Sequence, residues 1–306
     1  MRIRLSAEVA AALTDAHPVV ALESTLLAHG LPAPRNLAVA DRLERCVRDA
    51  GAVPATVAVL DGSALIGLTH AELERVCDPT EGLAKLSRRD LGVASAAGAC
   101  GATTVAATAA LAADAGIAVF ATGGLGGVHR GTQPSWDVSA DLEVLAQTPI
   151  LLVCSGVKSV LDVAATLEVL ETHSVPVLGY RTDTVPLFYL RDSPFAVPWR
   201  VDDPQDAAIA FAAHRTVPGR AGMVLANPIP AAAEMSTALH AELLDSGFDL
   251  LRARGVRGQD VTPVLLEHFH RHSGGASLRA NEELVCANAE LAAQVALRLA
   301  TTVAAR

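Results

Sequence analysis

Short apolar segments that resemble buried strands alternate with helical segments along most of this chain. The strand-like segments are PVVALEST, IAVFAT, PILLVC, PVLGY and GMVLA, which begin at residues 18, 117, 149, 176 and 222. Helical patterns separate them: one is expected with Asn36 as its cap, and others near 103–115, from Ser139 and from Lys158. This alternation is typical of a parallel sheet with helices on its faces, because each crossover helix buries its apolar side against the strands.

Two further features indicate a mixed sheet and a helical end to the chain. The segments VPATVAVL and ALIGL are joined by an Asp61-Gly62 turn, which predicts an antiparallel pair of strands at one edge. A short helix is expected to begin at Thr69 and a long one at about Ser277. No linker or repeat interrupts the pattern. We therefore predict one α/β domain over residues 1–306, with a largely parallel (mixed) central sheet and a helical C-terminal region.

Composition limits the kinds of partner that the chain can have. Its 24 basic and 33 acidic residues give a net charge of −9, which argues against a nucleic-acid or anionic-membrane partner. Residues 91–113 carry no charge, but small residues dominate them, which indicates a closely packed soluble helix pair rather than a membrane span. The five cysteines include no CxxC pair, and the N-terminus does not resemble a secretory signal. A cytoplasmic location is therefore expected.

Only two of the 24 basic residues are lysines, Lys85 and Lys158. Arginine stays protonated, whereas a lysine amine that loses its proton can attack a carbonyl carbon. Lys158 is expected at the start of a helix, whose positive end favours the neutral amine. The alternative is that both lysines lie on the surface by chance. Lys85 stands beside Arg88 and Arg89, a cluster suited either to a phosphate or to a solvated turn.

The segment ATGGLGGVHRG follows one of the predicted strands and predicts a tight anion-binding loop. Its glycines allow backbone amides to approach a ligand closely. It matches neither the dinucleotide-binding nor the P-loop spacing. Because ligands bind at the carboxyl ends of strands in such sheets, we expect four loops to meet at one rim: ALEST, ATGGLGGVHRG, VCSGVKS and LANPIP.

The segment after the glycine loop carries two carboxylates beside an expected helix cap. Ser139 is the predicted N-cap, Asp137 lies just outside the helix, and Asp141 lies in its first turn. The two carboxylates are hard oxygen ligands suited to Mg²⁺ or Mn²⁺. The alternative is that Asp141 simply complements the helix dipole. His129 could donate to a sugar hydroxyl or a base, or be merely structural.

Other polar residues leave two interpretations open. Glu23 ends an apolar strand, where burial would suit it to proton transfer, but it could equally bond the next loop. Asn281 could pair with the edge of a nucleobase or be an ordinary helix residue. His268, His270 and His272 are spaced so that neighbours do not share a helix face, and we expect a surface feature rather than a metal site.

Several long motifs, in order along residues 18–300, resemble one enzyme family. They are ALEST, GAVPATVAVLDG, KLSRRDL, GATTVAAT, FATGGLGGVHRG, DVSADLEVLA, VCSGVKSVLD, LETHSVPVLGY and ANPIP. The family is that of the pseudouridine-5′-phosphate glycosidases, also called indigoidine-synthase-A-like. The resemblance implies a homotrimer with an α/β/α core and a divalent metal, usually Mn²⁺, with Mg²⁺ as the alternative. The implied reaction is reversible cleavage of pseudouridine 5′-phosphate by water into uracil and ribose 5-phosphate.

The same resemblance implies roles for individual residues. Lys158 matches the nucleophile that forms a Schiff base with the opened ribose, Glu23 matches the proton donor, and Asp137 matches the metal ligand. The remaining matches are substrate or active-site positions, namely Lys85, Val105, His129, Ser139, Ala140, Asp141 and Asn281. Two alternatives stay open: another lysine-dependent sugar-phosphate lyase, and a non-catalytic nucleotide-binding regulator.

Overall fold

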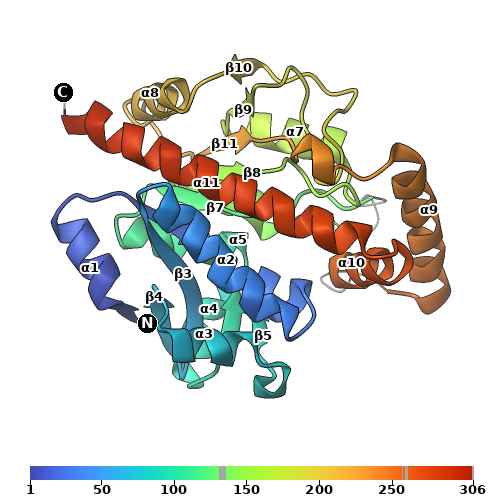
Figure 1. Ribbon diagram of the computed structural model, residues 1–306, viewed down its shortest axis with the longest axis horizontal. Helices are drawn as coiled ribbons and strands as arrows, with labels where there is room; N and C mark the ends of the chain where they lie inside the picture. The colour runs from blue at the N-terminus through green and yellow to red at the C-terminus, as the bar shows by residue number, and fades with distance from the viewer. Residues whose placement is uncertain (131–135, 257, 259–260, 305–306) are drawn as a thin grey trace.

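The computed structural model describes residues 1–130, 136–256, 258 and 261–304 (Figure 1). One continuous sheet runs through its centre, with strands in the order β1-β4-β3-β2-β7-β8-β11-β9-β10, and with β6 beside β3 and β5 beside β6. The strands are β1 (Arg2–Leu5), β2 (Val19–Leu22), β3 (Val53–Leu60), β4 (Ser63–Ile66), β5 (Ala84–Leu86), β6 (Gly101–Thr103), β7 (Val119–Ala121), β8 (Leu151–Cys154), β9 (Val177–Tyr180), β10 (Trp199–Val201) and β11 (Met223–Ala226).

The pairing of the strands confirms the predicted α/β class and the mixed sheet. Neighbouring strands are parallel except where β3 pairs with β4 and with β6. The β3–β4 pair is the antiparallel hairpin predicted around Asp61-Gly62, but it does not form the edge of the sheet as predicted, because β1 pairs with the outer side of β4. In the middle of the sheet Leu22 pairs with Ala121, and Ala121 pairs with Val153. The carboxyl ends of β2, β7 and β8 therefore lie side by side.

Helices cover both faces of the sheet and extend beyond one end of it. They are α1 (Ala7–Thr14), η1 (Leu26–Gly30), α2 (Arg35–Asp49), α3 (His70–Cys77), η2 (Pro79–Glu81), η3 (Arg88–Asp90), α4 (Leu91–Ala96), α5 (Val105–Asp114), α6 (Ala140–Gln147), α7 (Val163–Thr172), α8 (Pro204–His214), η4 (Ala231–Ala233), α9 (Thr237–Arg254), α10 (Val261–His272) and α11 (Ala276–Ala304). The predicted helical C-terminal region consists of α9, α10 and the long α11, which runs back across the sheet (Figure 1).

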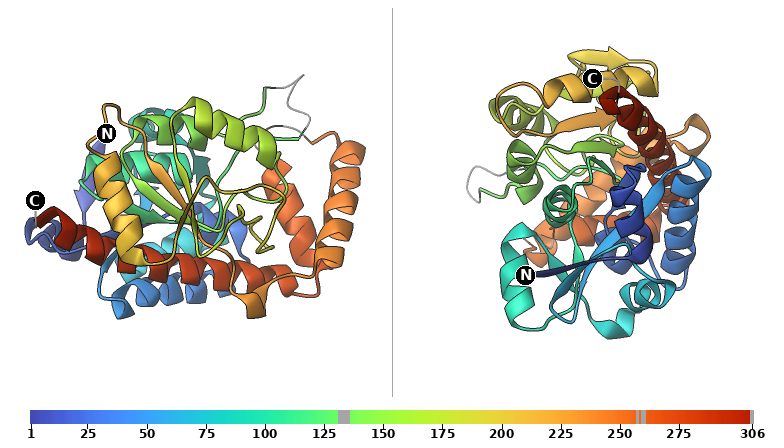
Figure 2. Two further views of the ribbon diagram at one scale, coloured as in Figure 1. Left: turned by 90° about the horizontal axis from the view of Figure 1, so that it is seen from above. Right: turned by 90° about the vertical axis from the view of Figure 1, so that its left-hand side faces the viewer.

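Two apolar clusters fill the space between the sheet and its helices. One lies under α2, α8 and α11 and includes Val47, Phe211 and Ala289. The other lies under α1, α5 and α6 and includes Val9 and Leu145. Figure 2 shows the sheet between these two helical layers. Alanines on the buried side of α11 allow this helix to lie directly against the strands, which produces the α/β/α sandwich.

Two predicted helix starts are wrong. Asn36 does not cap α2, because Pro34 holds the cap position and the buried Asn36 amide instead donates to two backbone carbonyls. No helix begins at Lys158: α7 begins at Val163, with Asp162 as its N-cap. Aspartate is a strong N-cap residue, so the sequence carried this signal. Lys158 lies in the loop between β8 and α7.

The uncharged segment at residues 91–113 is not the predicted helix pair. It forms α4, then the short strand β6, then α5. The glycines near its middle accommodate this change, and Gly101 in particular faces Leu86, where any side chain would collide. Within the described parts of the chain, no helix is both long enough and apolar enough to cross a membrane.

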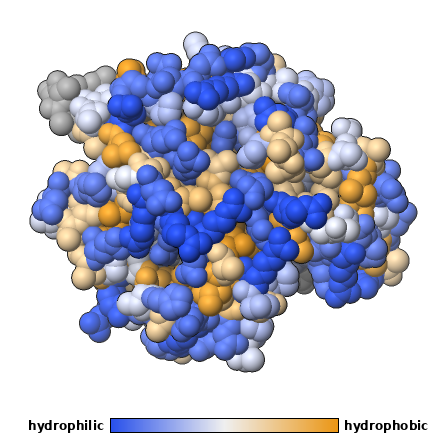
Figure 3. Space-filling view, in the orientation of Figure 1, coloured by the Kyte–Doolittle hydropathy of each residue, from blue (hydrophilic) through white to orange (hydrophobic). Residues whose placement is uncertain are grey.

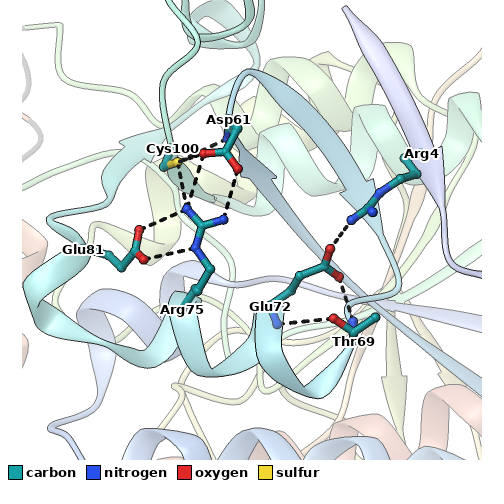
Figure 4. Close-up of polar contacts among 7 residues, drawn as sticks. All are labelled: Arg4, Asp61, Thr69, Glu72, Arg75, Glu81 and Cys100. Carbon is teal, nitrogen blue, oxygen red and sulfur yellow. Dashed lines mark hydrogen bonds and ion pairs between the residues drawn. The ribbon is translucent and has the colours of Figure 1, made fainter.

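Helix α3 is fastened at its start and along one side by polar contacts (Figure 4). Thr69 is its N-cap, as predicted, and forms a capping box in which the Glu72 amide donates to Thr69 Oγ1 (3.3 Å) and the Thr69 amide donates to Glu72 Oε2 (2.8 Å). Glu72 also pairs with Arg4 of β1, and Arg75 pairs with Asp61 in the β3–β4 turn (3.0 Å). Exposed ion pairs of this kind contribute little individually, so the capping box is the stronger constraint.

The outer surface is predominantly polar. On the face drawn in Figure 3, hydrophilic residues predominate and apolar residues are interspersed among them. The most exposed large apolar side chains of the described residues are Val93, Trp136 and Trp199, on α4, ahead of α6 and on β10. Scattered apolar side chains are ordinary on folded proteins.

Candidate active site

A cavity of about 480 Å³ opens at the carboxyl ends of β2, β7 and β8, beside η1 and α10. Every residue singled out in the sequence as a site position lines this cavity. These are Glu23, Lys85, Val105, His129, Asp137, Ser139, Ala140, Asp141, Lys158 and Asn281. The structure therefore brings all of the candidates together, although they come from seven separate parts of the chain.

Adjacent parallel strands bring Glu23 and Lys158 to the same edge of the sheet. Glu23 directly follows β2, and the Thr122 hydroxyl, which directly follows β7, donates to its carboxylate. Lys158 is half-buried in the loop after β8. Its amide donates to the Leu125 carbonyl (3.1 Å), and its carbonyl accepts from the Leu161 amide (2.9 Å). The backbone at Lys158 is thus held at both of its polar groups.

Burial decides the protonation of Glu23. It raises the pKa of the Glu23 carboxyl above its ordinary value, and the negative charge of Asp141 adds to the effect. The positive charge of Lys158, the hydrogen bond from Thr122 and the charge of Lys85 oppose it without reversing it. The carboxyl group therefore keeps its proton to a higher pH than an exposed glutamate, which suits a proton donor.

The Asp141 carboxylate hydrogen-bonds the backbone of the glycine loop and of α5. Its Oδ2 accepts from the Gly126 amide and its Oδ1 accepts from the Ala106 amide of α5, each at 3.0 Å. A Cβ atom on Gly126 would collide with Ser139 Oγ and with the Asp141 carboxylate, so only glycine allows this approach. Asp141 is 6% exposed. Its carboxylate therefore acts first on the protein's own backbone, which accounts for its place at the helix start better than dipole compensation alone.

The beginnings of two helices point at the cavity. Ser139 caps α6, as predicted, and Thr104 caps α5. The first residues of these helices, Val105 in α5 and Ala140 in α6, line the cavity. Lys85 reaches the same side from β5, whose neighbour β6 leads into α5. Helix N-termini carry partial positive charge and unpaired amides. Together with the Lys85 ammonium they make this wall attractive to an anion.

His129 and Asp137 form a pair in the wall of the cavity. His129 Nδ1 lies 3.7 Å from Asp137 Oδ2. Burial lowers the pKa of His129, and the charges of Lys85 and Lys158 lower it further, while Asp137 opposes them. The ring is therefore mainly neutral near pH 7 and has one donor nitrogen and one acceptor nitrogen.

The donor set at Asp137 fits a hydrated divalent cation. Each oxygen of Asp141 already accepts a backbone amide, which leaves fewer of its lone pairs for a metal ion. Among the described residues, no three His, Cys, Asp or Glu side chains converge as a ligand cage. Mg²⁺ and Mn²⁺ commonly bind through one or two carboxylates, keep several waters and use substrate phosphate as a further ligand. Asp137 is suited to such a site.

Besides Ser87 Oγ, two buried polar atoms in the cavity wall lack hydrogen-bond partners within the described structure, Asn281 Oδ1 and Thr25 Oγ1. Asn281 is only 2% exposed, and it lies near the start of α11. A buried polar group without a partner costs about 1–3 kcal/mol. Both atoms are therefore suited to hydrogen bonds with a ligand, which favours the binding interpretation of Asn281 over that of an ordinary helix residue.

The sequence analysis missed several residues of the cavity wall. His29 comes from η1, a single π-helical turn of a kind found frequently at functional sites. Burial lowers the pKa of His29, and the charge of Lys85 lowers it further. Phe188, with a left-handed φ of 61°, covers another part of the wall. Thr262 and Leu266 belong to α10, and no motif in the sequence connects α10 with the strand ends.

One of the four loops predicted at the rim does not line the cavity. LANPIP follows β11, but its Asn227 donates to Asn288 Oδ1 (3.0 Å). Asn288 of α11 is fully buried and also donates to the Thr122 carbonyl (2.8 Å). This loop therefore fastens α11 to the sheet, whereas the other three loops line the cavity.

Two of the three histidines of α10 are less exposed than we predicted, whereas His272 is exposed, as predicted. His268 and His270 are both half-buried, and His268 Nε2 lies 2.8 Å from Ser246 Oγ of α9. Burial lowers the pKa values of both rings. These contacts join α9 to α10 outside the cavity.

Comparison with known sequences identifies the family to which the chain belongs. A family model described as indigoidine synthase A like protein matches residues 8–298. Proteins called pseudouridine-5′-phosphate glycosidase match over nearly the full length of both chains. The protein from Streptomyces griseus is 55% identical, covering 97% of this chain and 92% of its own. The protein from Herpetosiphon aurantiacus is 50% identical, covering 97% of this chain and 98% of its own.

Two solved structures share the fold. The prealnumycin C-glycosynthase in complex with ribulose 5-phosphate is 38% identical, with a TM-score of 0.92, and the match covers 100% of this chain and 99% of that one. An indigoidine synthase A-like protein from Thermotoga maritima is 33% identical, with a TM-score of 0.88, covering 98% of this chain and 97% of its own.

Proposed function

We propose that this chain, which belongs to the indigoidine synthase A-like family, is an enzyme that cleaves pseudouridine 5′-phosphate. The reaction is the reversible addition of water across the C–C glycosidic bond, which yields uracil and ribose 5-phosphate. The observation that carries this proposal is that one cavity contains a lysine amine, a protonatable carboxyl group and an anion-attracting wall. Relatives that are about half identical are named for this activity, and a structural neighbour binds a five-carbon sugar phosphate.

The carbon leaving group requires chemistry that a pair of carboxylates does not supply. In an ordinary glycosidase the leaving oxygen is protonated, but a C-glycoside has no such atom. In our scheme the neutral amine of Lys158 attacks the anomeric carbon while Glu23 protonates the ring oxygen. The bond to the ring oxygen breaks and the ribose opens, which leaves an amine on the anomeric carbon. Uracil is then protonated on the carbon that carries the sugar, and the C–C bond breaks with its electron pair kept by uracil, while the nitrogen lone pair forms the iminium with the sugar carbon. Water then hydrolyses the imine and restores the amine.

The phosphate end of the substrate belongs at the wall formed by Lys85 and by the starts of α5 and α6. Backbone amides at Val105 and Ala140 and the Lys85 ammonium are the groups available for its oxygens. Four acidic residues, Glu23, Asp90, Asp137 and Asp141, also line the cavity. The wall therefore orients the substrate by attracting one end of it, and this orientation brings the sugar to Lys158.

The base end of the substrate belongs against Asn281 and Thr25. Uracil presents one N–H donor between two carbonyl acceptors, and an asparagine amide has one acceptor and two donors. Asn281 Oδ1 lacks a partner in the described structure, so an incoming N–H would satisfy it. The Thr25 hydroxyl would donate to a carbonyl. His129, which also lines the cavity, is assigned to a ribose hydroxyl in this scheme.

A divalent cation, Mn²⁺ or Mg²⁺, belongs at Asp137 in this scheme. When bound, it would offset the repulsion between the cavity carboxylates and the substrate phosphate. We expect Asp137→Asn to weaken Mn²⁺ binding at least about tenfold, because a ligating carboxylate loses its charge. Isothermal titration with Mn²⁺ alone measures this directly. Asp183→Asn, at an exposed aspartate outside the cavity, serves as the control, and equal affinity in the two variants would remove Asp137 from the metal site.

The test of the proposed function is uracil release. Purified protein is incubated with pseudouridine 5′-phosphate and Mn²⁺, and uracil is followed by chromatography; the reverse reaction starts from uracil and ribose 5-phosphate. Tight binding of the substrate without turnover would instead indicate a nucleotide-binding regulator. Turnover of other sugar phosphates without uracil formation would indicate a different lysine-dependent lyase.

The family resemblance also leads us to propose a homotrimer that works in the cytoplasm. All five cysteines are free thiols, and three of them are buried. A reducing compartment maintains this state. Light scattering that gives a mass different from three times the chain mass of 31.5 kDa would contradict the trimer.

A further inference from the structure

A buried histidine outside the cavity hydrogen-bonds the residue that follows Lys158. His240 lies on α9 and is 6% exposed. Its Nε2 is 2.7 Å from the hydroxyl oxygen of Ser159, which is 3% exposed. Neither residue lines the cavity. The contact joins the C-terminal helical region to the loop that carries the reactive amine.

The loop around Lys158 depends on such contacts for its conformation. It belongs to no helix or strand, so neighbouring groups must hold it. A turn is closed by the hydrogen bond from the Leu161 amide to the Lys158 carbonyl (2.9 Å). Arg130, at the end of the glycine loop, donates to the carbonyls of Leu161 (3.2 Å) and Ser159 (3.4 Å). The bond from His240 is the side-chain contact that reaches this turn from α9.

The His240 ring is fixed in place and carries no charge near neutral pH. Its ring packs edge-on against Phe269, with the ring centroids 5.6 Å apart. Burial, followed by the positive charge of Arg130, lowers the pKa of His240 to about 4. The neutral ring therefore hydrogen-bonds the Ser159 hydroxyl through Nε2.

The same helical region also supplies part of the cavity wall. Thr262, Pro263 and Leu266 of α10 line the cavity, and α10 packs against α9. Arg130 also lies over the Phe248 ring of α9, 5.4 Å from its centre. The helix pair α9 and α10 therefore contacts the turn at Lys158 and also forms part of the cavity wall.

We propose that His240 and Ser159 form a positioning pair that holds the Lys158 amine toward the sugar carbon it attacks. The inference rests on the proposed function, because only that function gives Lys158 a reacting carbon. A displacement of about 1 Å at a reacting group can lower a rate about a hundredfold. We therefore expect loss of the pair to slow imine formation. Binding of the phosphate and of the base should change little, because it depends on other residues.

The experiment compares Ser159→Ala, His240→Phe and the double variant with the wild type. We expect kcat with pseudouridine 5′-phosphate to fall roughly 10- to 100-fold in each single variant, with KM nearly unchanged. The rate at which borohydride traps the sugar should fall in parallel. The double variant should be no slower than the slower single variant, because both substitutions remove the same hydrogen bond. His240→Gln, which keeps a side-chain amide able to hydrogen-bond the Ser159 hydroxyl, should recover part of the rate.

A matched control exists in the same pair of helices. Ser246 of α9 and His268 of α10 form another serine–histidine contact, at 2.8 Å, and neither lines the cavity. Ser246→Ala should leave kcat, KM and the trapping rate at their wild-type values. Thermal unfolding identifies any variant that fails to fold, in which case Ser159→Ala alone decides the question.

Two outcomes would overturn the positioning role. One is wild-type kcat and trapping in Ser159→Ala; the other is a rise in KM or a loss of thermal stability at unchanged kcat, which would make the contact merely structural. Failure of the proposed function is recognised separately, because the wild type itself would then release no uracil and trap no sugar.

Discussion

Lys158→Arg is expected to abolish both turnover and covalent trapping of the sugar. The guanidinium group stays protonated in proteins and has no free electron pair for the anomeric carbon. Arginine keeps the positive charge that Lys158 carries before its amine loses a proton, so the influence of this charge on the pKa of Glu23 is largely preserved in the resting protein. The loss therefore isolates nucleophilicity. Losing a covalent nucleophile lowers kcat by on the order of 10⁴-fold or more.

The measurement combines kinetics with mass spectrometry. Wild-type protein treated with borohydride and pseudouridine 5′-phosphate should gain the mass of the reduced sugar phosphate, and digestion should locate it on Lys158. Lys85→Arg provides the comparison, since Lys85 acts in our scheme through its charge and arginine keeps that charge. That variant should still trap the sugar. Retained turnover in Lys158→Arg, or an adduct on another residue, would refute the scheme.

Glu23→Gln is expected to lower kcat by about 10²- to 10⁴-fold, the usual contribution of a positioned proton donor. Glutamine has nearly the same shape and can still bond the Thr122 hydroxyl, so the cavity keeps its form. It has no acidic proton to deliver to the ring oxygen. KM should change little, because the groups assigned to the phosphate and the base remain in place. Unchanged turnover would remove the assigned role from Glu23.

The pH dependence of kcat gives this prediction an independent readout. Burial raises the pKa of Glu23, so the protonated carboxyl persists above the range of an ordinary glutamate. Wild-type activity should fall as the pH rises through this elevated pKa, because the donor then loses its proton. Glu23→Gln should lack this limb of the profile. Glu44 supplies the control: burial raises its pKa too, but it lies outside the cavity, so Glu44→Gln should keep the wild-type profile.

Much of the fold was predictable because its signals are local. The strands that became β2, β7, β8, β9 and β11 were recognisable as short apolar runs, and the caps at Thr69 and Ser139 as single residues. Parallel strands end at one edge of their sheet, so loops that follow them meet without further information. The predicted start of the helix after β8 was wrong, because the apolar helical pattern begins near Lys158 but the N-cap residue lies further along the chain. Asp162 is the stronger cap, and it placed the start of α7 beyond Lys158.

The candidate site was predictable in its members but not in their contacts. The scarcity of lysine drew attention to Lys158 and Lys85, and the family motifs identified Val105, whose residue type alone would not have done so. Neither signal revealed that Asp141 binds two backbone amides or that α10 lines the cavity. These contacts join segments with no shared pattern.

The amino-acid sequence by itself determined which chemical groups the protein carries and at which edge of the sheet they collect, because strands, caps and turns depend on neighbouring residues. Only the tertiary structure decided how those groups are held and charged. The raised pKa of Glu23, the unpartnered Asn281 amide oxygen and the bond from His240 to Ser159 all depend on burial and on distances between remote segments. Burial is a property of the packed molecule, so no local pattern could specify it.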